Sequence, residues 1–341
     1  MNRIVSRDKI RGMFLGLAIG DALGMPAETL TRREIQKRFG RIDKYIEPRG
    51  HKWFDGKPAG MWTDDTQLTL AVADSFIDKG QFDMDDIAVR HVKALKESDL
   101  GWGSTTREAV QRLSEGTHWN ISGYSTTPLG RGIGNGVAMK IAPLAAYLTT
   151  RYRNHELSQP DVDDISRFAF MTHSTGIGAA SALAHIEAIY HCLTHTRRHF
   201  FDDEFLKAVI GAAKRHNTFT EDNSDSERDK LLFQLGYVDR LDWSVIPVEA
   251  MLKVFNGGTS KASSSLPFSY AMFLRNVDSI DAIYETVNAG GDTDSNGAIV
   301  GSLLGALYGE YIFPAHLVNE LWQKNHILEI ADRFCAVFGI V

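Results

Sequence analysis

Two short acidic segments lie far apart in the sequence and share an unusual make-up. Each combines aspartates with hydroxyl side chains, follows glycine and precedes an apolar pattern typical of a helix. Their oxygen-bearing side chains are Thr63, Asp64, Asp65, Asp292, Asp294 and Ser295. Carboxylates this close together repel one another unless a cation lies between them, and oxygen donors suit a hard ion such as Mg²⁺ or Mn²⁺. We therefore predict one metal site assembled from both segments.

Helix capping is the alternative interpretation of both segments. Threonine or aspartate commonly caps a helix, and the helix dipole favours acids in the first turn. Capping explains one acid in each segment well, but it does not require a second. Gly290 and Gly291, which precede the second segment, also indicate a sharp turn that leaves open space. With both segments in one chain, the shared metal site is the favoured interpretation.

A glycine-rich segment at 130–136 precedes an apolar run that begins at Val137. Glycine-rich backbone that runs into a helix N-terminus presents free N–H groups, which suit a phosphate group. A flexible turn is the alternative. The segment lacks the G-x-G-x-x-G spacing and a preceding strand, which argues against a dinucleotide-binding Rossmann site.

Three isolated titratable residues have both a structural and a functional interpretation. A lone histidine at a helix end, such as His173, is more often a cap or a hydrogen-bonded core residue than a catalyst. Glu28 is equally compatible with a solvated or capping acid. Asp21 lies between Gly20 and Gly24 on an otherwise apolar helix, which favours a buried partner.

The composition is that of an ordinary soluble globular protein. The chain has 341 residues and a formal net charge of −6, with 43% hydrophobic and 23% charged residues. This modest acidity provides no basic surface for nucleic acid, so a nucleic-acid partner is not expected. Cys192 and Cys335 make no disulfide framework, which favours a cytoplasmic location. No apolar run reaches the roughly 20 residues of a membrane span, so no membrane association is expected.

Hydrophobic periodicity predicts an all-helical chain. Apolar or small residues recur at helical spacing from Leu68 to Phe76, and there is no sustained strand-like alternation. Further helices are predicted at 83–97, 104–114, 136–149, 162–171, 176–194, 203–214, 278–288, 295–308 and 326–338. The polar stretch 217–230 is predicted to be an exposed loop. Because no long linker interrupts the pattern, we predict a single domain over residues 1–341.

Glycines recur at every fourth residue near both ends of the chain, at Gly12, Gly16, Gly20, Gly24, Gly297, Gly301 and Gly305. Glycine inside a helix costs about 1 kcal/mol relative to alanine, so these positions need a compensating contact. Residues four apart line one helix face, where the missing side chains let another backbone approach closely. We predict that the two helices pack together or against a common helix. An antiparallel pair would bring Glu28 beside Asp292 and Asp294.

Five segments resemble, in order, the ADP-ribosylglycohydrolase family: 12–28, 60–75, 134–145, 172–182 and 288–309. They span nearly the whole chain, which makes the resemblance specific. Proteins of this family are all-helical, dinuclear-metal hydrolases that remove ADP-ribose from modified proteins. The resemblance therefore implies an all-α fold, a single compact orthogonal helix-bundle domain of the ADP-ribosylglycohydrolase type.

The resemblance also assigns roles to individual residues. It implies that the first acidic segment supplies the metal ligands Thr63, Asp64 and Asp65. It implies that the second supplies Asp292, Asp294 and Ser295, where a serine hydroxyl replaces the usual threonine. The residues that it implies at the substrate are Gly134, Asn135 and Gly136, which wrap the diphosphate, together with His173 and Asp21. The implied catalytic acids are Asp64, Asp65 and Glu28.

The activity implied is cleavage of the N-glycosidic bond between ADP-ribose and a protein side chain, with arginine favoured. Two Mg²⁺ ions, or Mn²⁺, would hold the distal ribose through its 2″- and 3″-hydroxyls. Water would attack the anomeric carbon with help from Asp64, and Asp65, Glu28 or a second water would protonate the leaving group. The partner would be an ADP-ribosylated protein or a small ADP-ribose conjugate.

Other functions fit the same residues. A hydrolase of serine-linked, nucleic-acid-linked or small-molecule ADP-ribose conjugates would differ in what holds the leaving group, for which the loops at 47–57 and 101–106 are candidates. A non-catalytic ADP-ribose-binding protein is disfavoured, because all the matched acids are present and unpaired buried acids are costly without a metal. A helical protein with one structural metal would leave the glycine-rich segment unexplained.

Overall fold

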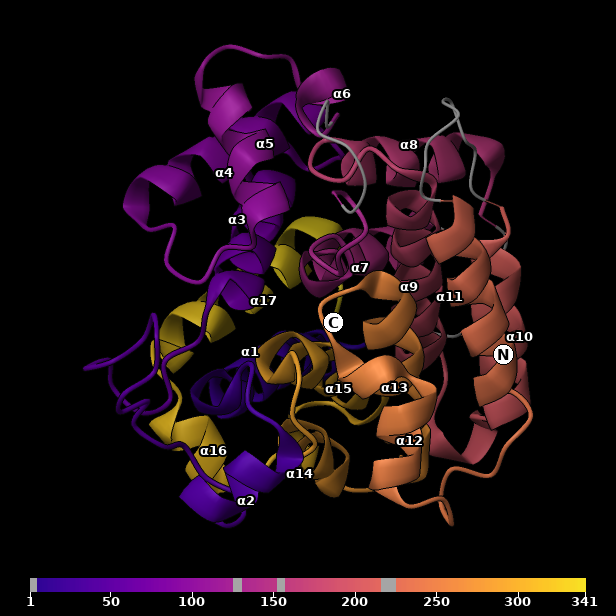
Figure 1. The fold of residues 1–341 in the computed structure, drawn as a ribbon. Helices are drawn as coiled ribbons and strands as arrows, with labels where there is room; N and C mark the ends of the chain where they lie inside the picture. Colours follow the sequence, from indigo (N-terminus) through magenta and orange to yellow (C-terminus); the bar gives the residue numbers. More distant parts are fainter. Residues whose placement is uncertain (1–4, 125–130, 152–156, 216–224) are drawn as a thin grey trace.

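The computed structural model describes residues 5–124, 131–151, 157–215 and 225–341, which form a helical bundle (Figure 1). The α-helices of these residues are α1 (Arg7–Gly24), α2 (Arg32–Phe39), α3 (Asp64–Lys79), α4 (Met84–Glu97), α5 (Ser104–Ser114), α6 (Trp119–Ser122), α7 (Ala142–Arg151), α8 (Gln159–Phe170), α9 (Gly176–Thr194), α10 (Asp202–Ala213), α11 (Asp225–Val238), α12 (Val248–Val254), α13 (Ala262–Arg275), α14 (Asp281–Val287), α15 (Thr293–Tyr308), α16 (Ala315–Glu320) and α17 (Lys324–Phe338). Short 3₁₀ helices lie between them: η1 (Met25–Ala27), η2 (Ala138–Lys140), η3 (Arg197–His199), η4 (Asn256–Gly258) and η5 (Glu310–Ile312).

Strand structure in the described ranges is limited to two isolated bridges. Thr31 pairs with Gly290, and Gly134 pairs with Lys261. No described helix combines the length and apolar composition that a membrane crossing requires.

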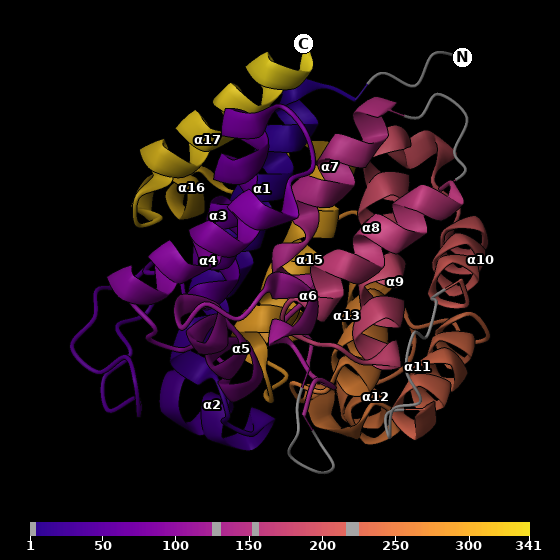
Figure 2. The ribbon, with the colours of Figure 1, turned by 90° about the horizontal axis from the view of Figure 1, so that it is seen from above.

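Helices α1 and α15 form an antiparallel pair whose backbones touch. A Cβ added at Gly12 would lie 2.6 Å from the carbonyl oxygen of Gly305, and one added at Gly20 would lie 1.9 Å from that of Gly297. No side chain fits in such a gap, which explains the glycine at every fourth position. Both views show the two helices side by side near the middle of the molecule (Figures 1 and 2). The predicted glycine-lined packing is therefore confirmed, in its antiparallel form.

Helix α9 is the second central element. Every residue from Gly176 to Leu193 is buried, because α7, α8, α10, α13 and α15 all pack against it. Many of its residues are small, including Ala179, Ala180 and Ala182, so neighbouring helices approach closely. Helix α3 packs against α1, α4, α7 and α17. The acidic segments thus begin helices that are held on several sides.

Most predicted helices are present to within about three residues at each end. The predicted helix at 136–149 differs, because it is divided into η2 and α7. Pro143 is the cause: it lacks an N–H, and its ring would clash with the carbonyl group four residues earlier in a continuous helix. Near the start of α7 the same residue is favourable.

Six α-helices of the described residues were not predicted: α2, α6, α11, α12, α13 and α16. The longest are α11 and α13. Part of the expected loop at 217–230 is the start of α11, whereas residues 217–224 lie outside the described ranges. The polar first turn of α11 concealed an apolar face formed by Leu231, Leu235 and Val238. Helix α13 begins with serines and contains Pro267, yet every residue from Ala262 to Leu274 is buried. Packing therefore overrides its local propensity.

Candidate active site

The C-terminal end of α1 and the first turn of α15 are joined by hydrogen bonds. The Thr293 hydroxyl donates to the carbonyl oxygen of Gly24 at 2.7 Å. Just beyond η1, the Thr29 N–H donates to the carbonyl oxygen of Gly291 at 2.8 Å. The residues that end and follow α1 thus contact the residues that begin α15, as the antiparallel packing predicts.

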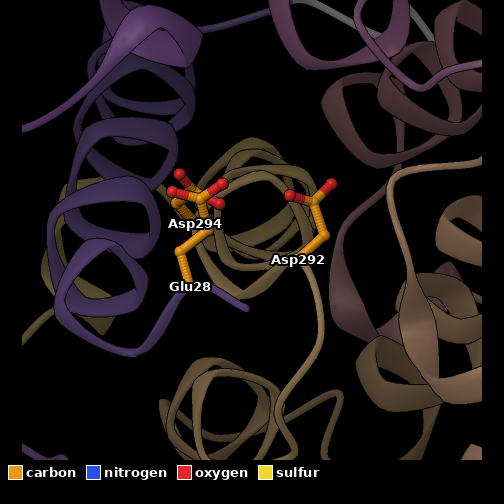
Figure 3. Close-up of side chains that lie close together, drawn as sticks. All are labelled: Glu28, Asp292 and Asp294. Atoms are coloured by element: carbon orange, nitrogen blue, oxygen red, sulfur yellow. The ribbon is translucent and has the colours of Figure 1, made fainter. Parts of the chain in front are cut away.

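Three carboxylates converge at this junction (Figure 3). Glu28 is the C-cap residue of η1, Asp292 is the N-cap residue of α15, and Asp294 lies in the first turn of α15. One carboxylate oxygen from each lies within 4.8 Å of those of the other two. This spacing allows all three to contact a single cation, as the sequence predicts for Asp292 and Asp294.

Asp21 holds the start of α3 in place through hydrogen bonds. It is fully buried in α1. Its carboxylate accepts from the Thr63 N–H at 2.9 and 3.0 Å and from the Thr63 hydroxyl at 2.9 Å. It also accepts from the Thr66 N–H at 3.1 Å and the Thr66 hydroxyl at 2.6 Å. Both its oxygens are engaged by α3, which favours a positioning role, whereas substrate contact by Asp21 stays a prediction.

Asp64 and Asp65 form the first turn of α3 and are both buried. Burial, together with repulsion from the carboxylates of Asp21 and Asp292, raises the pKa of Asp64 to about 7. Burial also raises the pKa of Asp65 well above its usual value, with added repulsion from Asp21, Asp64 and Asp292. The two acidic segments therefore interact directly across the junction.

Glu28 is a further carboxyl group of this site with a raised pKa. Burial, together with repulsion from Asp292, Asp64 and Asp21, raises the pKa of Glu28 to about 8. Its Oε2 is buried without a hydrogen-bond partner, and so is Oδ1 of Asp65. A buried carboxylate oxygen without a donor is costly, so these atoms call for a proton or a cation. The donor set is all oxygen, which fits Mg²⁺ or Mn²⁺.

The second acidic segment has a partner in the glycine-rich segment. Asn135 donates from Nδ2 to Oδ2 of Asp292 at 2.6 Å. Burial raises the pKa of Asp292, and this hydrogen bond is the main effect that opposes the rise. Ser295 is buried, and its hydroxyl lowers the pKa of Asp65. The predicted ligands Asp292 and Ser295 are thus joined to residues of the other segments.

His173 lies directly under the glycine-rich loop. A Cβ added at Gly136 would be 2.9 Å from its Cε1, and one added at Gly134 would be 3.5 Å from its Nε2. Burial, and to a lesser degree Lys140, lowers the pKa of His173 to about 3, so its ring is neutral. The loop itself leads into η2 rather than into an α-helix. The structure therefore groups these predicted substrate residues, although without a full helix dipole behind them.

Two residues at this site were missed by the sequence reasoning. Lys140 is fully buried, and its ammonium group donates to the Thr172 hydroxyl at 3.3 Å. Burial lowers its pKa to about 7, an effect that the nearby Asp64 opposes. A single lysine inside the apolar run from Val137 was a usable signal, because a buried charge needs a partner. Thr66 was also overlooked, although it stands beside Asp65.

The predicted leaving-group loops border the acids. In the loop at 47–57, His51 Nε2 lies 4.0 Å from Oε2 of Glu28. A Cβ added at Gly101 would lie 2.8 Å from the Phe54 ring and 3.1 Å from Oδ1 of Asp64. Both loops therefore reach the carboxylates, and their role with the leaving group stays a prediction.

Comparison with known proteins decides the family. The model of the family described as ADP-ribosylglycohydrolase matches residues 2–340. The chain belongs to the ADP-ribosylglycohydrolase family. It is 30% identical over 339 residues to the ADP-ribosyl-[dinitrogen reductase] glycohydrolase of Rhodospirillum rubrum, a match that covers 98% of this chain and 97% of the relative. Family membership makes the chain a hydrolase of the ADP-ribosylglycohydrolase type.

Two further comparisons agree with this ADP-ribosylglycohydrolase assignment. The ADP-ribosylarginine hydrolase Tri1 of Pseudomonas putida (strain GB-1) is 26% identical over 341 residues, which cover 96% of this chain and 77% of the relative. A solved structure described as an ADP-ribosylglycohydrolase-related protein complex superposes with a TM-score of 0.66 at 24% identity, covering 97% of this chain and 98% of that one. This superposition confirms the predicted fold class.

Proposed function

We propose that this chain is a metal-dependent hydrolase that releases ADP-ribose from ADP-ribosylated arginine side chains of proteins. The observation that carries the proposal is the convergence of Glu28, Asp292 and Asp294 within 4.8 Å, beside the buried Asp64 and Asp65. Such a cluster is costly without a cation. The names of two relatives, one acting on dinitrogen reductase and one on ADP-ribosylarginine, favour a protein arginine as the modified group.

Two Mg²⁺ or Mn²⁺ ions would be held by the predicted ligands Thr63, Asp64, Asp65, Asp292, Asp294 and Ser295. Bound there, the ions would supply positive charge that orients the hydroxyls of the distal ribose and makes the attacking water easier to deprotonate. Glu28 is an additional candidate, because its Oε2 is buried without a hydrogen-bond partner and one of its carboxylate oxygens lies within 4.8 Å of oxygens of Asp292 and Asp294. Asp21 would hold the first segment in place through Thr63 and Thr66.

The acids of the chain would carry the proton transfers. Asp64, with a pKa near neutrality in the metal-free protein, is placed to accept a proton from the attacking water. Asp65 or Glu28 would return a proton to the leaving guanidine. As the scissile bond breaks, the distal ribose would gain oxocarbenium character in the transition state. The surrounding carboxylates would stabilise this positive charge electrostatically. Gly134 and Gly136 would contact the diphosphate, and His173, which packs against both glycines, would lie near the substrate.

The partner in this proposal is an ADP-ribosylated protein, and residues 1–341 act as a single domain. The family match over residues 2–340 supports one domain, as do site residues that come from both ends of the chain. We also propose a cytoplasmic location. Cys192 and Cys335 are both free and buried, which is compatible with a reducing compartment.

Release of free ADP-ribose tests this function. A protein ADP-ribosylated on arginine and the same protein ADP-ribosylated on serine would be incubated with the enzyme in Mg²⁺, Mn²⁺ or EDTA. We expect metal-dependent release from the arginine-linked substrate that EDTA abolishes. Release from the serine-linked substrate alone would refute the arginine assignment. Tight binding of ADP-ribose without release from either substrate would refute catalysis.

A further inference from the structure

Asn135 belongs to the glycine-rich segment and links this segment to the acidic cluster. It is 5% exposed, and its backbone N–H donates to the carbonyl oxygen of Ser260 at 2.8 Å. Its side-chain Nδ2 lies 2.6 Å from Oδ2 of Asp292 and 3.0 Å from the hydroxyl of Ser265. One amide group therefore joins the loop to a carboxylate at the start of α15 and to a serine of α13.

The donors and acceptors of this network have only one consistent arrangement. Asn296 donates from Nδ2 to the carbonyl oxygen of Gly258 at 2.7 Å, so its Oδ1 must face the serine. The Ser265 hydroxyl donates to that Oδ1 at 2.7 Å. Ser265 then accepts from Asn135, and Asp292 accepts from the second amide hydrogen. The orientation of the Asn135 amide is thus fixed by the series of hydrogen bonds from Gly258 through Asn296 and Ser265.

This arrangement has a consequence for the role of Asn135. Both hydrogens of its amide are used within the protein, so the amide is engaged before any diphosphate arrives. The contact to Asp292 is a short hydrogen bond to a charged acceptor, a class that is stronger than a neutral one. It holds one carboxylate oxygen of Asp292 in place and so restricts the orientation of the whole carboxylate, one oxygen of which lies within 4.8 Å of oxygens of Glu28 and Asp294.

We propose that Asn135 is a positioning residue that orients Asp292 for cation binding and couples the glycine-rich loop to the metal site. The inference rests on the proposed metal-dependent function. Since Gly134 and Gly136 flank Asn135, a ligand that orders the loop also orders the carboxylate. Coupling of this kind is reciprocal, so ADP-ribose should raise metal affinity by the factor by which metal raises ADP-ribose affinity.

The test is the affinity for Mn²⁺ and Mg²⁺, measured by titration calorimetry on the full chain without ADP-ribose. We expect Asn135→Ala to weaken metal binding by about 10- to 100-fold, the usual effect of losing a hydrogen bond to a metal ligand. The increase in metal affinity that ADP-ribose produces in the unaltered protein should be smaller in the same variant, with the remainder due to direct contact between the metal and the distal ribose. A residue that only contacted the diphosphate would leave metal affinity unchanged.

Adjacent serines of α13 provide a matched pair of variants. Ser265→Ala removes the acceptor that orients Asn135, and we expect it to weaken metal binding by several-fold. Ser264→Ala is the control, because the Ser264 hydroxyl donates to the Phe255 carbonyl and accepts from the Thr259 N–H at 3.1 Å, and neither bond includes Asn135, Ser265 or Asp292. Ser265→Ala also tests the proposal if Asn135→Ala does not fold.

The outcomes separate this inference from the proposed function. If the unaltered protein binds neither metal, the proposed metal-dependent function fails. If it binds metal and Asn135→Ala binds equally well, the positioning role of Asn135 is wrong while the function stands. The same holds if Ser265→Ala and Ser264→Ala have equal metal affinities.

Discussion

At the scale of single residues, buried carboxylates set the chemistry of this protein. Glu28 and Asp65 each have an oxygen that is buried without a hydrogen-bond partner, whereas both oxygens of Asp21 accept from backbone and hydroxyl donors. Buried carboxylates therefore have two different roles in this protein. Asp21 holds the first acidic segment in position, and the others leave oxygens free for a cation.

Removal of single ligands tests the role of the second segment. Asp292→Ala and Asp294→Ala should each abolish turnover and weaken metal binding at least about 10-fold, because each removes a carboxylate from the cluster. The fold should persist, as judged by circular dichroism, since removing an acid also relieves repulsion. Asp203→Ala, at an exposed carboxylate on α10, is the control and should leave activity unchanged. Near-normal activity of both variants in excess Mg²⁺ would contradict the metal site.

The raised pKa values predict how the stability of the metal-free protein depends on pH. Burial raises the pKa of Glu28 from 4.5 to about 8 and that of Asp64 from 3.8 to about 7. The folded protein then holds more protons than the unfolded chain between those values. Its free energy of unfolding should therefore fall as pH rises from about 5 to about 8.

Urea unfolding in EDTA at several pH values checks this expectation. Glu28→Gln cannot ionise, so its stability should fall less steeply over the same range. Added Mg²⁺ should reduce the slope in the unaltered protein, because a cation offsets the repulsion between ionised carboxylates. A metal-free stability that is constant or rises over this range would show that the cluster is not protonated in the folded state.

At the scale of elements, the contact between α1 and α15 brings the acids together. A Cβ added at Gly301 would lie 1.9 Å from the carbonyl oxygen of Gly16, so the two helices approach as closely as backbones allow. Four such contacts along the pair fix both the distance and the register of the helices. Since Glu28 follows α1 and Asp292 begins α15, this register places the carboxylates opposite one another.

A glycine substitution in this contact should separate the two helices. We expect Gly20→Ala to destabilise the protein by about 3 kcal/mol or more, because its Cβ would meet the Gly297 carbonyl oxygen, which is backbone and cannot move aside. Gly211→Ala is the matched control. Gly211 lies inside α10 with open space around it, so alanine there should stabilise by about 0.5–1 kcal/mol. Urea unfolding measures both, and equal stabilities would contradict the packing argument.

At the scale of the whole molecule, the site joins parts of the chain that are distant in sequence. Residues near 21–28, 63–66, 135 and 292–296 contribute to it, and helices α9 and α13 both pack against α15, which carries the second acidic segment. Global unfolding must therefore separate the carboxylates. A ligand that binds only the assembled cluster should stabilise the entire fold.

Thermal unfolding with and without metal tests this linkage. At a metal concentration about 100-fold above the dissociation constant, we expect stabilisation of about 2.7 kcal/mol, seen as a higher Tm. EDTA should reverse the shift, and Asp292→Ala should show little or none. The same Tm in Mg²⁺, Mn²⁺ and EDTA would mean that the cluster does not bind these ions.

The sequence by itself determined the helical fold class, the pairing of the glycine-lined helices and the meeting of the acidic segments. These features depend on local spacing: helical periodicity, glycine at every fourth residue and carboxylates beside hydroxyl groups. The sequence did not predict the helix boundaries around Pro143 or the polar start of α11. A proline or a polar first turn interrupts the hydrophobic period without ending the helical region.

Only the tertiary structure decided which atoms each acid contacts. Asp21 and Asp64 are both aspartates near glycine or hydroxyl residues in the sequence, yet α3 saturates Asp21 and leaves Asp64 beside Asp292. The engagement of Asn135 with Asp292, and the burial of Lys140 beside Thr172, join residues from separate helices. Hydrogen-bond partners and desolvation depend on distances across the fold, and no periodicity along one chain encodes them.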